Sequence, residues 1–182
     1  LTFLDNNISL EWMNKTGAKV QNLLTKGSLN HLEHQIKKSP SEYFKLVSKC
    51  ITNANKLGIT TNVYLEDWSN GMRNSIDYVF DFLNVLTKLP VKRILLPDTL
   101  GILSPKETFT HISSIVKKYP NTPFDFHAHN DYDLSVSNVI EALNAGCNGL
   151  HLTVNGMGER AGNAPMASVA AVIKDFIPNV KI

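Results

Sequence analysis

Short apolar runs alternate along the chain with longer amphipathic stretches in a repeated strand-then-helix order. This order is typical of a parallel sheet whose faces are covered by helices. Six such units can be recognised, each with a helix expected after its strand. The expected strands are Leu1 to Leu4, Lys19 to Leu24, Thr60 to Leu65, Arg93 to Pro97, Phe124 to His129 and Gly149 to Val154.

Several helix boundaries are visible in the sequence. The runs 39–42 and 104–107 each place Ser at the cap, Pro in the first turn and Glu at the third helical position. Gly58 and Gly146 are expected to end helices. A further helix is expected from Tyr132 to Ala145, after the fifth strand.

The number of units limits the choice of fold. A closed (β/α)₈ barrel needs about 250 residues, whereas this chain has 182. We therefore predict an α/β fold, a partial (β/α)₈ TIM barrel of about six βα units that lacks the first strands. Residues 1–182 are expected to form one partial catalytic domain, a fragment without the first strands and without C-terminal accessory and regulatory regions.

Composition excludes several other classes of protein. The chain is 43% hydrophobic and 19% charged with a net charge of +2, as expected of an ordinary soluble protein without a basic stripe for nucleic acid. No apolar run approaches the length of a membrane span, so no membrane partner is expected. Cys50 and Cys147 fit no metal or redox spacing, which favours reduced thiols in a cytoplasmic protein.

Polar side chains are concentrated just after the expected strands. His127 and His129 lie two residues apart on a strand, so they project to the same side and can share one divalent metal ion. The runs 64–67, 97–99 and 155–163 follow three other strands. At the C-terminal face of a barrel these segments would build one pocket, whereas ordinary solvated loops would scatter such residues without regard to strand ends.

A glycine-rich loop follows the last expected strand. Glu159 and Arg160 are flanked by Gly156, Gly158 and Gly162, which would give the loop freedom to fold over a metal and its ligands. The alternative is a plain turn with an exposed ion pair. The glycine spacing is not that of a dinucleotide site, so NAD is not expected.

The remaining histidines have weaker claims to function. His31 and His34 do not match His-Glu-x-x-His and are assigned no role. His111 lies in an expected helix and is predicted to be peripheral. His151 lies on the last expected strand, where it either packs in the core or supports the metal ligands from behind.

Three motifs together resemble a known family. The runs 96–101 (Leu-Pro-Asp-Thr-Leu-Gly), 127–131 (His-Ala-His-Asn-Asp) and 155–163 (Asn-Gly-Met-Gly-Glu-Arg-Ala-Gly-Asn) resemble, in this order, the isopropylmalate, homocitrate and citramalate synthase family. Its members are metal-dependent barrels that catalyse Claisen condensations. The runs 19–28 and 63–71 are most similar to the bacterial citramalate synthases, which condense pyruvate with acetyl-CoA.

The resemblance implies a metal site and a co-substrate. It implies that His127 and His129 bind a divalent cation, Zn²⁺ or Mn²⁺, with Asn163 as a further ligand or near ligand. Another family ligand, an Asp that follows an Arg on the first strand, has no counterpart in this sequence. The co-substrate implied by the resemblance is acetyl-CoA.

The resemblance also assigns residues to the reaction and to the substrate. Glu66 matches an acid implicated in proton transfer, although it could instead pair with a neighbouring Arg to hold the rim together. Thr99 matches a hydroxyl that binds the substrate carboxylate, although a Thr at a strand end is commonly a cap. Leu1, Leu24 and Tyr64 match a compact apolar wall that selects pyruvate; core packing could equally require the two leucines.

We therefore expect an acyltransferase that makes (R)-citramalate for isoleucine biosynthesis and acts as a homodimer on small-molecule substrates. The alternatives are a 2-isopropylmalate synthase of leucine biosynthesis, a homocitrate synthase, a related lyase or carboxyltransferase, or a noncatalytic metal-binding or structural fragment. The 182 residues alone are expected to show little or no turnover.

Overall fold

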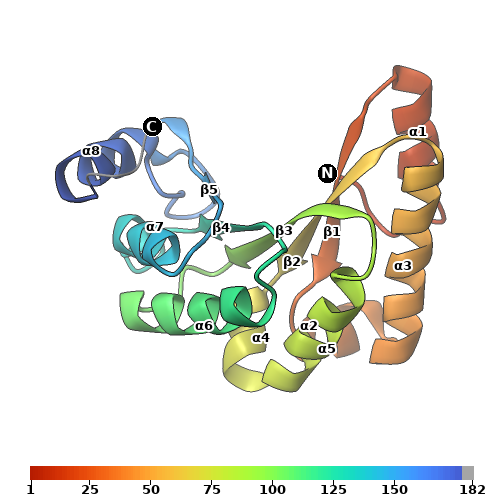
Figure 1. Cartoon of the computed structure of the whole chain (residues 1–182), viewed down its shortest axis with the longest axis horizontal. Coiled ribbons are helices and arrows are strands. Elements are labelled where there is room, and N and C mark those ends of the chain that lie inside the picture. The colour runs from red at the N-terminus through yellow and green to blue at the C-terminus, as the bar shows by residue number, and fades with distance from the viewer. Residues whose placement is uncertain (178–182) are drawn as a thin grey trace. The chain divides into compact units, whose positions relative to one another are not determined.

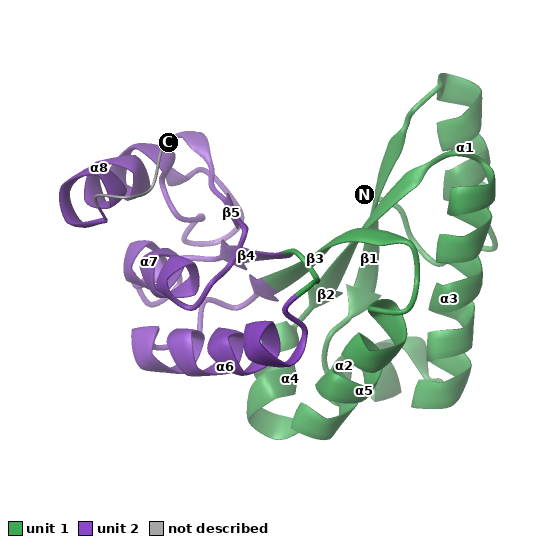
Figure 2. Ribbon diagram, viewed as in Figure 1, with its two compact units in different colours: residues 1–96, 121–123 green, residues 97–120, 124–182 purple. Residues whose placement is uncertain are grey.

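The computed structural model describes residues 1–177, which divide into two compact units (Figures 1 and 2). Unit 1 comprises residues 1–96 and 121–123, and unit 2 comprises residues 97–120 and those from 124 onward. The elements of unit 1 are α1 (Ile8–Thr16), β1 (Val20–Lys26), α2 (Leu29–His31), the π-helical turn η1 (Leu32–Ile36), α3 (Pro40–Lys56), β2 (Thr60–Glu66), α4 (Trp68–Asn74), α5 (Ile76–Leu86) and most of β3 (Val91–Asp98). The elements of unit 2 are α6 (Pro105–Lys118), β4 (Phe124–Ala128), α7 (Ser135–Asn144), β5 (Gly149–His151), the 3₁₀ turn η2 (Val154–Gly156) and α8 (Met166–Phe176).

The strands of unit 1 run parallel, with β2 paired to both β1 and β3. The β1–β2 register runs from Val20 opposite Thr60 to Lys26 opposite Glu66. Burial alternates along both strands because successive side chains point to opposite faces. One face carries fully buried residues such as Leu23 and is part of the core, while the other face is half-buried.

The two strands of unit 2 are also parallel, and β4 pairs with β5 from Asp125 opposite Gly149 to His127 opposite His151. Phe124, Phe126 and Ala128 are fully buried, and they lie on the face of β4 opposite to Asp125 and His127. Helices α6 and α7 lie side by side in this unit (Figure 1). Alternation on β4 therefore separates apolar packing from the polar side chains of Asp125 and His127.

The expected helix boundaries are largely confirmed. Ser39 and Ser104 each form a complete capping box with the Glu three residues later, and Pro occupies the first turn of both helices. Gly58 and Gly146 follow α3 and α7 with φ of +68° and +99°, a left-handed backbone that glycine adopts without strain. These local signals depend on neighbours within four residues, so the sequence alone displays them.

Three expected boundaries were wrong. The strand expected over residues 1–4 is reduced to Thr2, whose backbone bonds Asn22 and Leu24 before the chain turns into α1. The last strand ends at His151, because Thr153 bonds the 164–166 segment instead of continuing the β4 ladder. Helix α7 begins at Ser135 rather than at residue 132, because residues 130–133 form a turn.

Burial determines the acidity of the two cysteine thiols. Cys50 and Cys147 are buried free thiols, and burial raises the pKa of Cys50 to about 11 and that of Cys147 to about 12. Neither thiol is therefore activated as a thiolate near neutral pH.

Within residues 1–177, every helix is too short or too polar to cross a bilayer.

Gly71→Ala should destabilise the protein by about 1 to 3 kcal/mol or more, although Ala normally favours a helix. A Cβ atom at Gly71 would overlap the backbone oxygen of Gly27 and lie 2.8 Å from a methyl group of Val79. Chemical denaturation of the complete protein measures the loss. Gly58→Ala is the control, since a Cβ there meets nothing within 4 Å and adds only left-handed backbone strain. An unchanged free energy of unfolding for Gly71→Ala would contradict the close packing.

Candidate active site

Two histidines extend from the carboxyl end of β4 in unit 2. His127 is on the strand and His129 follows it, and their ring centroids are 5.0 Å apart with an interplanar angle of 83°. Both side chains are half-buried. The spacing of two along an extended backbone therefore brings the rings together, as the sequence predicted.

The surroundings of both rings favour neutral imidazole. Burial and the neighbouring His129 and His151 lower the pKa of His127 to about 4, although a hydrogen bond to the His151 backbone opposes the shift. Burial also lowers the pKa of His129, as does Arg160. A metal binds the neutral form of histidine, so both rings are held in the state that a ligand requires.

Asn163 lies beside His129 because the two residues form an isolated antiparallel bridge. The Asn163 side-chain nitrogen donates to the Met157 carbonyl at 3.2 Å, which leaves its oxygen as the remaining acceptor. Within residues 1–177, neither this buried oxygen nor the buried Nδ1 of His129 has a hydrogen-bond partner. Two neighbouring buried polar groups without partners each cost about 1 to 3 kcal/mol, a cost that a bound ion would remove.

The donor set fits a divalent cation. Two imidazoles with an amide oxygen are ligands that Zn²⁺ and Mn²⁺ accept. Residues 1–177 contain no group of three or more His, Cys, Asp or Glu that could hold a metal. Beside the two imidazoles, the Asn163 oxygen is an unpartnered donor of the described residues.

The loop that carries Asn163 is held against the end of β4. Asn130 N donates to the Gly162 carbonyl at 2.9 Å, and Ala164 N donates to the Ala128 carbonyl at 3.2 Å. A Cβ atom at Gly158 would overlap the Asn163 side chain, and one at Gly162 would overlap the backbone of Gly156. The glycines therefore allow close packing of the loop around Asn163.

Arg160 links this loop to two others. Its guanidinium binds the Asp131 carboxylate through two hydrogen bonds of 2.7 and 2.9 Å and donates to the Thr99 carbonyl at 2.8 Å. The bidentate contact lowers the pKa of Asp131 and raises that of Arg160. Glu159, in contrast, is 82% exposed and lies 3.8 Å from the Arg160 guanidinium. Arg160 therefore connects three loops. Its contact with the exposed Glu159 corresponds to the alternative given from the sequence, a plain turn with an exposed ion pair.

The end of β3 is ordered by Asp98. Its fully buried carboxylate accepts hydrogen bonds from the backbone nitrogens of Ile102 and Leu103, and its carbonyl accepts one from His129 N at 3.2 Å. Thr99 follows it, half-buried, with its carbonyl bound by Arg160. The structure thus places Thr99 in the same loop cluster as His129.

A polar pair lies behind the two histidines. Asp125 shares the face of β4 with His127, is 4% exposed, and lies 3.3 Å from His151 Nε2. Gly149 makes room for this pair, since a Cβ there would lie 2.5 Å from an Asp125 oxygen. The His151 backbone also opposes the lowering of the His127 pKa. Of the two alternatives for His151, the structure favours a support behind the candidate ligands.

In unit 1 the half-buried faces of β1 and β2 form three cross-strand pairs. Asn62 donates to Asn22 at 2.9 Å, Leu24 lies opposite Tyr64, and Lys26 Nζ lies 2.5 Å from Glu66. The structure thus brings Leu24 and Tyr64 together, while Leu1 is 72% exposed. The ion pair that the sequence offered as an alternative role for Glu66 is present, but its partner is Lys26 and not an Arg.

Several residues of these clusters were given no role of their own from the sequence. Asp125 could have been found from its spacing of two before His127. Lys26, Asp98 and Asp131 could not, because their roles depend on cross-strand register and on contacts between loops distant in sequence.

In the metal-free protein, lowering the pH from about 6.5 to 4 should reduce stability through His127. Its folded-state pKa of about 4 lies below the unfolded value of 6.5, so the unfolded chain binds the proton first. The stabilisation is complete above pH 6.5 and is lost across this window, with an upper bound of about 3 kcal/mol. Denaturation in chelator at several pH values measures it. His127→Gln should reduce the pH dependence of the free energy of unfolding, whereas replacement of the exposed His34 by Gln should not. An equal pH dependence in the two variants would contradict the assignment of the effect to His127.

Comparison with known proteins identifies relatives of the chain. A homocitrate synthase of Saccharolobus islandicus (strain L.S.2.15 / Lassen #1) is 34% identical over 144 residues, which cover 79% of this chain and 31% of that protein. A homocitrate synthase of Sulfurisphaera tokodaii has the same identity and coverage. The chain thus spans about a third of the length of these relatives.

Solved structures share the fold. An HMG-CoA lyase of Bacillus subtilis superposes with a TM-score of 0.81 at 21% identity, covering 95% of this chain and 61% of the other. The carboxyl transferase domain of Rhizobium etli pyruvate carboxylase superposes with a TM-score of 0.70 at 13% identity, covering 92% and 26%. The fold is a partial (β/α)₈ barrel, as predicted. Residues 6–180 match the family described as HMGL-like, and the chain therefore belongs to this family of metal-dependent TIM-barrel condensing enzymes and their relatives.

Proposed function

We propose that this protein is an acyltransferase that condenses acetyl-CoA with a 2-oxo acid in a metal-dependent Claisen reaction. The observation that carries the proposal is the pair of unpartnered buried atoms, Nδ1 of His129 and Oδ1 of Asn163, beside the neutral ring of His127. These three side chains would hold the cation, Zn²⁺ or Mn²⁺. When bound, the cation would supply Lewis-acid polarisation of the keto group under attack.

The chain's own residues would handle the proton and the substrate carboxylate. Glu66 would take a methyl proton from acetyl-CoA, so that the resulting carbon nucleophile attacks the keto carbon. Thr99 would bind the carboxylate of the 2-oxo acid, with its loop held by Arg160. Water then cleaves the thioester of the condensed product and releases the thiol of coenzyme A.

Pyruvate is the proposed acceptor, which would make the product (R)-citramalate of isoleucine biosynthesis. Support comes from the paired Leu24 and Tyr64, whose bulk would limit the size of the acceptor side chain. A small apolar pocket discriminates one methylene by about 1 to 3 kcal/mol. Leu1 adds less support because it is 72% exposed. The curated relatives are named homocitrate synthases, which makes 2-oxoglutarate the second acceptor to test.

A lyase is the second candidate reaction. Solved structures that share the fold include HMG-CoA lyases, and a lyase would break the carbon–carbon bond that a synthase forms.

We also propose that the active form is a homodimer located in the cytoplasm. Glu159 is proposed to serve the loop only as an exposed partner of Arg160.

Thiol release from acetyl-CoA by the complete protein with Mn²⁺ or Zn²⁺ tests the reaction. Pyruvate, 2-oxoisovalerate and 2-oxoglutarate are compared as acceptors. Pyruvate-selective release would support citramalate synthesis, and preference for a larger acid would keep the reaction class but reject the pocket argument. Release with none of the three would contradict the synthase and favour the lyase, which is assayed by cleavage of a 3-hydroxyacyl-CoA, or a noncatalytic fragment.

A further inference from the structure

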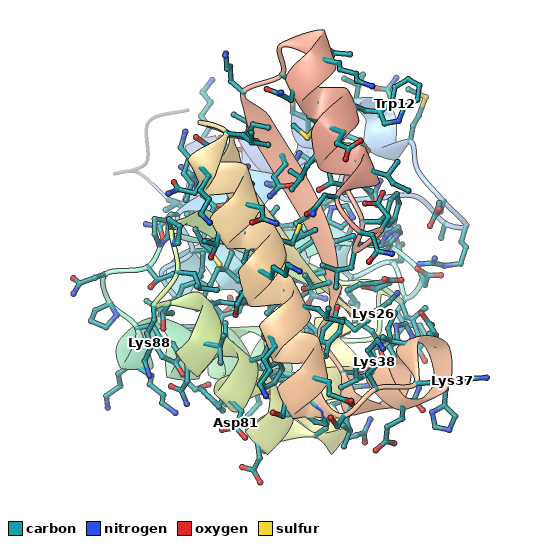
Figure 3. The ribbon with its side chains drawn as sticks, turned by 90° about the vertical axis from the view of Figure 1, so that its right-hand side faces the viewer. Trp12, Lys26, Lys37, Lys38, Asp81 and Lys88 are labelled. Carbon is teal, nitrogen blue, oxygen red and sulfur yellow. The ribbon has the colours of Figure 1, made fainter. Side chains whose placement is uncertain are left out.

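Lys26 is the last residue of β1, at the carboxyl end where parallel (β/α) sheets carry their chemistry. Neither the sequence motifs nor the proposed reaction gives this residue a role. Figure 3, which labels Lys26, shows it close to helix α3. Both its backbone and its side chain are held by specific contacts within unit 1.

The backbone of Lys26 is held by two tyrosine hydroxyls. Its N–H donates to the Tyr43 hydroxyl of α3 at 2.8 Å, and its carbonyl accepts from the Tyr78 hydroxyl of α5 at 2.8 Å. Tyr43 is 1% exposed and Tyr78 is 6% exposed, and both rings pack against Phe82. The end of β1 is therefore fixed by two buried side chains from separate helices.

The side chain of Lys26 is held by Glu66. The two residues are directly opposite in the β1–β2 register, and the ammonium nitrogen lies 2.5 Å from a Glu66 carboxylate oxygen. Their side chains are only 15% and 25% exposed. The pair is therefore largely shielded from solvent, and a residue that moves a proton must be held in a defined position.

We propose that Lys26 is a positioning residue for Glu66. Its ammonium holds the carboxylate in one orientation, and the two tyrosines fix the strand end from which the ammonium extends. The inference rests on the proposed function, in which Glu66 transfers a proton. It adds that the effect of Lys26 on catalysis passes through Glu66 and not through separate contact with an anionic substrate.

A double-mutant cycle on the complete protein tests this route. Lys26→Met should lower kcat by about 10- to 100-fold and leave KM for both substrates within about twofold, because a displaced proton acceptor loses rate without losing substrate contacts. Lys26→Arg should recover part of kcat. In a Glu66→Gln background, Lys26→Met should change the residual kcat by less than about twofold, since the group it positions is gone.

Controls separate this inference from folding and from the proposed function. Lys88→Met removes an exposed lysine of the same unit and should leave kcat unchanged. Thermal unfolding verifies that Lys26→Met remains folded. If it does not, the double-mutant cycle with Glu66→Gln is measured with Lys26→Arg instead. Additive losses in the cycle, or a raised KM with normal kcat, would overturn the positioning role. An active wild type with an unaffected Lys26→Met would overturn this inference alone, and a wild type inactive with every acceptor would overturn both proposals.

Discussion

Replacing His127 or His129 with alanine should lower the affinity for Zn²⁺ or Mn²⁺ by at least about 100-fold, a larger effect than loss of an outer-sphere partner. The two rings are 5.0 Å apart at the end of one strand, and the environment of each favours the neutral imidazole that binds metal. Removing either ring leaves too few protein ligands for a stable site. Titration calorimetry and metal analysis after dialysis measure the loss directly, without dependence on turnover.

The exposed His34 provides the matched control, because His34→Ala removes an imidazole at the surface of unit 1. It should leave metal content unchanged. Asn163→Ala should weaken metal binding less than either histidine variant, since it removes a neutral amide oxygen. Stoichiometric metal in both histidine variants would contradict the site, whatever the activity of the protein.

Glu66→Gln should lower kcat for acetyl-CoA-dependent thiol release by about 10² to 10⁴-fold, the usual contribution of a general base. The amide keeps the size of the side chain but cannot accept the methyl proton. KM should change little, because the carboxylate acts on the reacting proton and not on the remainder of the substrate. Steady-state kinetics with the preferred 2-oxo acid measure both constants.

Glu33→Gln is the control for this prediction, since Glu33 is exposed on η1 in the same unit. It should leave kcat unchanged. If Glu66→Gln retained full kcat but unfolded at a lower temperature, the carboxylate would be a structural partner of Lys26 only, as the ion pair by itself would allow.

The sequence by itself determined the features that arise from short-range patterns. Short apolar runs between longer amphipathic stretches indicated the strands, the Ser-Pro-x-Glu runs indicated the starts of α3 and α6, and the spacing of His127 and His129 indicated a shared face. Each depends on backbone geometry within a few residues, which tertiary contacts did not change. The family followed from motifs that can be compared without a structure.

Tertiary structure alone decided which distant residues meet. The register of β1 against β2 places Lys26 opposite Glu66, and Arg160 binds Asp131. The bridge between residues 129 and 163 brings together two residues that each have a buried polar atom without a partner. A further long-range contact shortened the last strand, because Thr153 pairs with the 164–166 segment instead of continuing the ladder. Sequence periodicity specifies which face a side chain occupies but not its partner across the sheet, since register and loop packing are set by contacts far apart in the chain.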